Sequence, residues 1–223
     1  KRASAWGVKF QYRDMTNFYA DSNEIGDELV KSELERNFLS FEDLAILRDF
    51  SHSLDLNFGI SIFRTSDLDH YMLNSKKLDF LKVPSAECLN VELVTRCFEY
   101  CDTVFVSTGG QHLTDVISAY SNFASKDLTL LHCVANYPTV DGSQNLSKIT
   151  ELAKYFKTGY SSHDENYLHC IAALALGAST IERHITRDKN GPGLDDSSSS
   201  DLTEMMEIGN YCNLIEEIIG SPK

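Results

Sequence analysis

The sequence has little proline, little basic charge and no long apolar run. Its 223 residues include four prolines and 12 glycines, which leaves little material for a linker, so one domain is the simplest organisation. Acidic side chains outnumber basic ones by 33 to 20, and a formal charge of −13 repels a phosphate backbone. No apolar stretch approaches the ~20 residues of a membrane span. We therefore expect neither nucleic acid nor a membrane as a partner.

The six cysteines lack the spacing of a metal site or of a disulfide framework. No two of them form a C-x-x-C pair, none forms a Cys/His finger, and the sequence opens without the pattern of a signal peptide. We therefore expect reduced thiols in a cytoplasmic protein. With 42% apolar and 24% charged residues, the composition is that of a soluble globular domain with its own core.

Short apolar or β-branched runs alternate with amphipathic segments along the whole chain. The runs predict seven strands, at residues 6–11, 57–63, 80–84, 103–107, 128–134, 158–161 and 178–183. Helical periodicity predicts helices at residues 41–53, 91–100, 113–123, 146–156, 168–176 and 202–219. This alternation indicates a parallel α/β sheet, and no glycine-rich dinucleotide turn follows the first strand.

The spacing of these units favours a TIM (β/α)8 barrel over residues 1–223 that lacks its first strand, because such barrels need ~250 residues. We expect the gap between the strand at 178–183 and the strand at 6–11. Polar residues recur at the carboxyl ends of the strands, where barrel active sites lie. They are Lys9, Gln11, Lys82, Ser85, Ser107, Thr108, His132, Tyr137, Ser161, His163, Glu182 and His184.

His163 and His184 are one βα unit apart, so they are expected at equivalent heights on neighbouring strands. Two neutral imidazoles that leave room for water and substrate oxygen suit a borderline divalent ion such as Mn, Co or Zn. The alternative, that one or both histidines only form hydrogen bonds within the barrel mouth, is equally compatible with the spacing.

Lys9 and Lys82 would face the barrel interior, where two ammonium groups need an anion such as a phosphate or a carboxylate. Nearby serines and the turn at residues 107–110 supply hydroxyl and backbone donors that suit phosphate oxygens, although each serine alone could simply cap a helix. Glu87 and Glu182 are candidate acids or bases, or structural partners of the lysines. The serine run at residues 197–200 predicts a mobile polar loop.

Six strand-end stretches, in order, resemble the sialic acid synthase family. They are residues 8–11 (VKFQ), 81–87 (LKVPSAE), 107–110 (STGG), 131–139 (LHCVANYPT), 159–163 (GYSSH) and 181–186 (IERHIT). The loop at residues 191–195 (GPGLD) is also similar to the family. The resemblance covers almost the whole chain, and ordered matches at six strand ends are more specific than any single motif.

The resemblance implies a TIM-barrel transferase that condenses phosphoenolpyruvate with the aldehyde of an N-acyl hexosamine, giving a nonulosonic acid and phosphate. It implies a divalent metal, Mn²⁺ first and Mg²⁺ or Co²⁺ otherwise, on His163 and His184. Phosphoenolpyruvate would be held by Lys9, Gln11, Ser61, Lys82, Ser85, Ser107 and Ser161. Glu87 would relay a proton or position water beside the enol carbon, with Lys9 and Lys82 as its catalytic companions. Tyr137 and Asp195 would bind the sugar chain.

The resemblance also implies a homodimer for the full-length protein, and a chain that lacks the family's first strand and its C-terminal antifreeze-like domain. Residues 24–26 (EIG) match a family motif of the first strand but stand after the VKFQ strand, so we interpret them as a chance match. Two alternatives are another phosphoenolpyruvate–aldose synthase, and a catalytically weakened barrel that binds sugar or serves in assembly.

Overall fold

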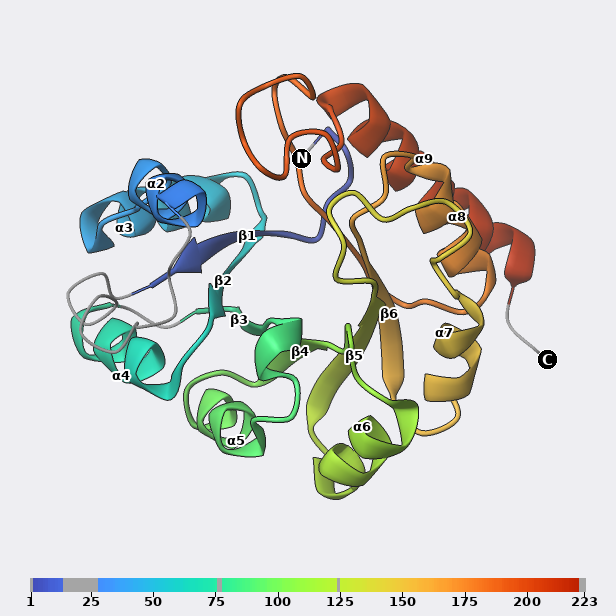
Figure 1. Ribbon diagram of the computed structural model, residues 1–223, viewed down its shortest axis with the longest axis horizontal. Coiled ribbons are helices and arrows are strands. Elements are labelled where there is room, and N and C mark those ends of the chain that lie inside the picture. Colours follow the sequence, from blue (N-terminus) through green and yellow to red (C-terminus); the bar gives the residue numbers. More distant parts are fainter. Residues whose placement is uncertain (1, 14–27, 76–77, 124, 221–223) are drawn as a thin grey trace.

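A computed structural model describes residues 2–13, 28–75, 78–123 and 125–220, and these form a curled sheet of seven parallel strands (Figure 1). The spatial order of the strands is their order in the sequence. They are β1 (Gly7–Tyr12), β2 (Asn57–Ile62), β3 (Phe80–Val83), β4 (Thr103–Ser107), β5 (Asp127–Cys133), β6 (Lys157–Ser162) and β7 (Ile181–Arg183). Because every neighbouring pair is parallel, the carboxyl ends of all seven strands meet at one edge of the sheet.

Except for α2 (Glu28–Arg36), which lies at the rim, the helices cover the outer face of the curled sheet (Figure 1). The helices are α2, α3 (Phe41–Ser53), α4 (Thr65–Asn74), α5 (Val91–Tyr100), α6 (Leu113–Tyr120), α7 (Ser147–Leu152), α8 (Leu168–Ala175) and α9 (Leu202–Ile219), with 3-10 turns η1 (Ser85–Glu87) and η2 (Ser121–Phe123). Capping boxes begin two of them: the side chain of Ser40 caps α3 and that of Asp201 caps α9, each accepting the backbone N–H three residues later. Within the part of the chain described, no helix is both long and apolar enough to cross a membrane.

Apolar side chains pack on both faces of the sheet. Ile60, Leu81 and Val104, on three successive strands, have no exposed surface and belong to the main core cluster. Inside the curl, the rings of Phe80 and Phe105 meet edge to face with centroids 5.5 Å apart. Gly59 makes room for this packing, because a Cβ at that position would lie 2.4 Å from the Phe80 ring.

The sheet confirms all seven predicted strands and their parallel order. Its two edge strands are β1 and β7, which are the strands predicted to flank the gap. A closed eight-stranded barrel and a missing first strand stay predictions. Helices α2 and α4 were not predicted, and residues 24–26 lie outside the described residues.

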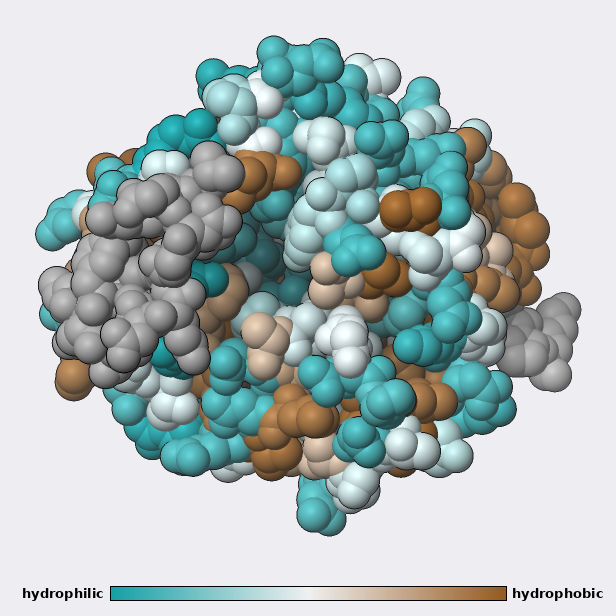
Figure 2. Space-filling view, in the orientation of Figure 1, coloured by the Kyte–Doolittle hydropathy of each residue, from teal (hydrophilic) through white to brown (hydrophobic). Residues whose placement is uncertain are grey.

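A large cavity of about 1330 Å³ lies between the two edge strands and α9. Its walls include Lys9 and Gln11 of β1 and Glu182 of β7, followed by His184 and Asp195. The space-filling view, in the orientation of Figure 1, shows a hollow near the centre of the visible face, with hydrophilic residues inside it (Figure 2). The fold therefore brings the predicted strand-end residues of the two edge strands to the wall of one open space.

Candidate functional site

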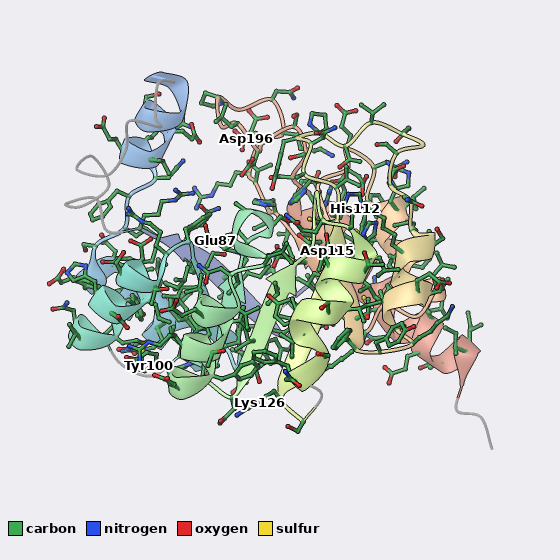
Figure 3. The ribbon with its side chains drawn as sticks, turned by 60° about the horizontal axis from the view of Figure 1, so that its bottom comes forward. Glu87, Tyr100, His112, Asp115, Lys126 and Asp196 are labelled. Atoms are coloured by element: carbon green, nitrogen blue, oxygen red, sulfur yellow. The ribbon has the colours of Figure 1, made fainter. Side chains whose placement is uncertain are left out.

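The candidate site lies at the carboxyl end of the sheet. Glu87, which follows β3, and Asp196, which follows β7, lie toward the same end of the molecule, whereas Tyr100 and Lys126 lie at the opposite end (Figure 3). Register explains the arrangement: Gln11 pairs with Ser61, Ser61 with Lys82, and Ser161 with Glu182. Side chains of equal height on parallel strands therefore converge.

An ion pair joins opposite sides of the curled sheet. The Nζ atom of Lys82 donates to Oε1 of Glu182 at 2.8 Å, and the Ser161 hydroxyl donates to the same oxygen at 3.0 Å. The side chains of Lys82 and Glu182 are only 5% and 18% exposed. Burial raises the pKa of Glu182, but the charges of Lys82 and Lys9 and the two hydrogen bonds outweigh burial and hold this pKa well below its usual range. Glu182 is therefore a carboxylate at neutral pH.

Lys9 adds a second ammonium group to the same region. Its Nζ atom donates to the hydroxyl of Ser61 at 2.8 Å. Burial lowers the pKa of Lys9, the charge of Glu182 opposes this, and the like charge of Lys82 lowers the pKa further. Two ammonium groups face one carboxylate here, so the cluster carries a positive excess inside a protein of formal charge −13. That excess favours a bound anion.

Serine hydroxyls and a glycine turn line the next part of the site. The backbone N–H of Gly109 donates to Oγ of Ser85 at 3.1 Å, and this Oγ lies 3.0 Å from Sγ of Cys133. A Cβ on Gly109 would lie 2.7 Å from that sulfur, so the turn requires glycine. The buried Oγ of Ser107 has no hydrogen-bond partner among the described residues. A free buried hydroxyl of this kind is available to a ligand.

His163 and His184 meet with ring centroids 5.7 Å apart. Nδ1 of His163 lies 2.9 Å from the carbonyl oxygen of Val134, so Nδ1 carries the proton and Nε2 keeps its lone pair. Nδ1 of His184 lies 3.5 Å from Oδ2 of Asp195. Burial lowers both pKa values, and with the charge of Lys9 it brings that of His184 to about 3. Both imidazoles are therefore neutral at pH 7.

This pair fits a divalent metal ion with open coordination positions. Neutral imidazoles with oriented ring nitrogens and a carbonyl or carboxylate partner behind them are the usual protein ligands of borderline ions. No cluster of three or more histidine, cysteine, aspartate or glutamate side chains that could hold a metal exists among the described residues. The protein would thus supply two nitrogen ligands, and water and substrate oxygen would supply the others.

The remaining predicted residues lie around this core of the site. The Tyr137 ring packs on His163 with centroids 4.0 Å apart and is half exposed. Asp195 and His184 line a second, smaller pocket of about 430 Å³ beneath α2 and the loop at residues 192–199. Gln11 is exposed on β1. Glu87, the last residue of η1, accepts a hydrogen bond from Nδ2 of Asn90 at 2.8 Å, so its carboxylate meets the N-cap of α5 rather than the lysines.

The structure also corrects one prediction and adds residues that the sequence did not indicate. The serine run is not a mobile polar loop: Ser198, Ser199 and Ser200 are buried, and the N–H of Ser200 donates to the carbonyl of His184. Cys133 and Asp164 were not predicted as parts of the site. The only available signal was their position directly at the ends of β5 and β6.

Comparison with known proteins places the chain in a family. The NeuB family matches residues 1–223. The N,N'-diacetyllegionaminic acid synthase of Legionella pneumophila is 32% identical over 99% of this chain and 67% of its own length. An uncharacterised protein of Methanocaldococcus jannaschii is 31% identical over 99% of this chain and 65% of its own length, so the chain spans about two thirds of these relatives.

Solved structures show the same fold. One is the crystal structure of an N-acetylneuraminic acid synthetase from Leptospira borgpetersenii in complex with citrate. It matches with a TM-score of 0.85 at 24% identity, and the match covers 100% of the present chain and 78% of the synthetase chain. A spore coat polysaccharide biosynthesis protein from Bacillus subtilis has a TM-score of 0.81 at 26% identity, covering 97% of this chain and 61% of its own. The chain therefore belongs to the NeuB family, the sialic acid synthase family that its strand-end motifs predict.

Proposed function

We propose that the protein condenses phosphoenolpyruvate with the open-chain aldehyde of an N-acyl hexosamine, giving a nonulosonic acid and phosphate in a divalent-metal-dependent reaction. The observation that carries the proposal is the arrangement, in a NeuB-family chain, of two lysines and two histidines at one cavity wall. Lys9 and His184 line the cavity, Lys82 pairs with Glu182 of the same wall, and the His163 ring meets that of His184. Named relatives are synthases of sialic and legionaminic acids. Because the chain spans about two thirds of its relatives, the activity of the whole protein is part of this proposal.

The donor is an anion with phosphate and carboxylate groups, which accounts for the positive cluster. Lys9 and Lys82 would pair with these groups. The Ser61 hydroxyl accepts from Lys9, the Ser161 hydroxyl shares Oε1 of Glu182 with Lys82, and the Ser85 hydroxyl, which accepts from Gly109, would add a further contact. The unpartnered hydroxyl of Ser107 supplies a further donor. Gln11, exposed at the end of β1, would close the site from the cavity side.

The acceptor aldehyde needs its oxygen charge stabilised while the new carbon–carbon bond forms. When bound on His163 and His184, Mn²⁺, or Mg²⁺ or Co²⁺, would supply Lewis-acid polarisation of that oxygen. The carbonyl of Val134 orients the His163 ring so that Nε2 presents its lone pair, and the Asp195 carboxylate lies 3.5 Å from Nδ1 of His184. Tyr137 and Asp195 lie beside the histidines and would hydrogen-bond the sugar chain.

The reaction balances with one water molecule. C3 of phosphoenolpyruvate bonds to C1 of the aldehyde, whose oxygen gains a proton, and water adds to C2. Loss of phosphate from C2 then leaves the 2-keto group. Glu87, at the same end of the sheet, is proposed to position this water or relay its proton, which requires its carboxylate to leave Asn90 when substrates bind.

A coupled assay tests the proposal directly. Phosphate release is measured with phosphoenolpyruvate, Mn²⁺ and a panel of N-acyl hexosamines, and the nine-carbon keto acid is identified by mass spectrometry. We expect equal amounts of both products and no turnover in His163→Ala. Lys157→Met is the matched control, because Lys157 forms an exposed pair with Asp127 at the amino end of β6. Turnover that survives complete metal removal, or phosphate release without keto acid, would refute the proposal.

A further inference from the structure

Behind the two histidines lies a buried carboxylate with four polar contacts. Asp164 has no exposed surface. Its Oδ2 atom accepts hydrogen bonds from the hydroxyls of Tyr160 and Ser162, both at 2.7 Å, and Oδ1 accepts one from Nε2 of Gln144 at 2.9 Å. Nδ1 of His169 lies 3.4 Å from Oδ1. Such a fully satisfied carboxylate is fixed in place, because moving it away from its donors would leave a buried charge unpaired.

The hydrogen bonds continue from Asp164 to the strand that carries the second histidine. The Ser162 hydroxyl donates to Asp164 and accepts a hydrogen bond from Nη1 of Arg183 at 3.1 Å. Nε of Arg183 donates to the hydroxyl of Ser200 at 2.9 Å. Asp164 directly follows His163, and Arg183 directly precedes His184. The chain Asp164–Ser162–Arg183 therefore links the backbones on which both imidazoles stand.

A second set of contacts ties the same carboxylate to the segment that packs on His163. Gln144 lies between β5 and α7, as do Tyr137 and Thr139. The N–H of Thr139 donates to the carbonyl of His163 at 2.9 Å, and the Tyr137 ring covers the His163 ring. Asp164 thus holds β6 to this segment from one side while Ser162 holds it to β7 from the other.

We propose that Asp164, acting through Ser162 and Arg183, is a positioning residue that fixes the separation of His163 and His184 and so sets the affinity of a divalent cation for the pair. The inference rests on the proposed function, in which these histidines are the ligands. Strand pairing alone leaves side-chain separation adjustable, since β7 has three residues and, among the described residues, pairs with β6 alone. The polar chain supplies the missing constraint, and partners behind metal-binding histidines commonly change affinity by about 10–100-fold.

The experiment measures Mn²⁺ binding to the whole chain, by calorimetry and by the electron paramagnetic resonance signal of free Mn²⁺, together with the melting temperature. Ser162→Ala removes only the bridging hydroxyl, and Asp164→Asn removes the charge. Thr158→Val is the matched control: it removes a buried hydroxyl from the same strand, bonded to the carbonyl of Phe156 at the far end. We expect the Mn²⁺ dissociation constant to rise about 10–100-fold in Ser162→Ala and Asp164→Asn and to stay within about twofold in Thr158→Val.

Kinetics separate positioning from general loss of structure. Excess Mn²⁺ should restore turnover in Ser162→Ala, and its KM for phosphoenolpyruvate at saturating Mn²⁺ should match that of the unmodified protein. Should Asp164→Asn fail to fold, Ser162→Ala decides. Wild-type Mn²⁺ affinity in folded Ser162→Ala, or an equal loss in Thr158→Val, would overturn the inference. His163→Ala reports on the histidine site itself: retained affinity there would reject the proposed ligands, whereas lost affinity there with normal affinity in Ser162→Ala would reject only the role of Asp164.

Discussion

Removing Lys82 should destabilise the protein by stranding Glu182. The two side chains are 5% and 18% exposed, and Nζ lies 2.8 Å from Oε1. Breaking a buried pair of this kind costs about 3–5 kcal/mol. Since Ser161 and Lys9 still stabilise the carboxylate, we expect the lower end, about 3 kcal/mol, in Lys82→Met. For a chain of 223 residues this corresponds to a fall of roughly 6–12 °C in melting temperature.

Thermal and denaturant unfolding check this value against two further variants. The double variant Lys82→Met/Glu182→Gln should regain about half or more of the loss, because it no longer buries an unpaired charge. Lys157→Met, which breaks a pair with Asp127 that is about half exposed, should cost less than about 1 kcal/mol.

The pH dependence of the Lys82→Met deficit has a defined sign. The folded pKa of Glu182 is depressed, so its contribution to stability is present above the unfolded value of about 4.3 and is lost as the pH falls. The deficit of Lys82→Met should therefore stay nearly constant from pH 7 to about 5 and shrink as the pH falls below about 4.3. An unchanged melting temperature in Lys82→Met, or a double variant as unstable as the single one, would refute this account of the pair.

Three further outcomes are expected. The pKa of His184 is lowered to about 3 in the folded protein, whereas it is about 6.5 in the unfolded chain. Below about pH 6.5 the unfolded chain therefore binds a proton at His184 that the folded protein does not bind. Metal-free protein should thus lose about 1 kcal/mol more stability between pH 7 and 5.5 than His184→Gln in urea titrations, and equal losses would contradict the burial argument. Gly109→Ala would place a Cβ 2.8 Å from Oγ of Ser85 and would push this hydroxyl out of position. The substitution should weaken phosphoenolpyruvate binding about tenfold or more in calorimetry. Unchanged affinity would show that this turn does not contact the donor. Mn²⁺ should raise the affinity for phosphoenolpyruvate by about 5–150-fold, with the reciprocal effect on Mn²⁺ binding, and independent binding of the two would contradict their sharing one site.

The strands were predictable because each is a short apolar run, and a run of this length buries its side chains best as a strand inside the sheet. The run at residues 103–107, for example, is β4 with its predicted bounds, and register then fixes which strand ends meet. Helix α2 was missed because it is short and mostly polar and lies on the rim, where residues 32–38 are exposed or only partly buried. Helix α9 was predicted with its bounds from helical periodicity, and the structure adds a capping box of Asp201 and Glu204 at its first turn.

The site was predictable as a set of residues but not as a set of pairs. Strand spacing shows that the charges of Lys9 and Lys82 face the interior, but it does not show which charges they meet. The pairing of Lys82 with Glu182 was therefore one of two alternatives for these lysines. Asp164 was missed for a different reason. An aspartate just after a strand resembles a helix cap, and only the tertiary structure shows the hydroxyls of Tyr160 and Ser162 on it.

Charge balance connects the two halves of the site. Lys9, Lys82 and Glu182 together carry one positive charge, and the two histidines contribute none because burial keeps them neutral. Fully ionised phosphoenolpyruvate brings three negative charges and a divalent cation brings two positive ones, so these five groups sum to zero, and the carboxylate of Asp195 beside His184 brings the total to one negative charge. Either ligand alone would leave a net charge of two or three units in a partly buried space, where uncompensated charge is costly. The lysine pair and the histidine pair are therefore complementary, since the cation held by the histidines offsets the charge of the anion held by the lysines.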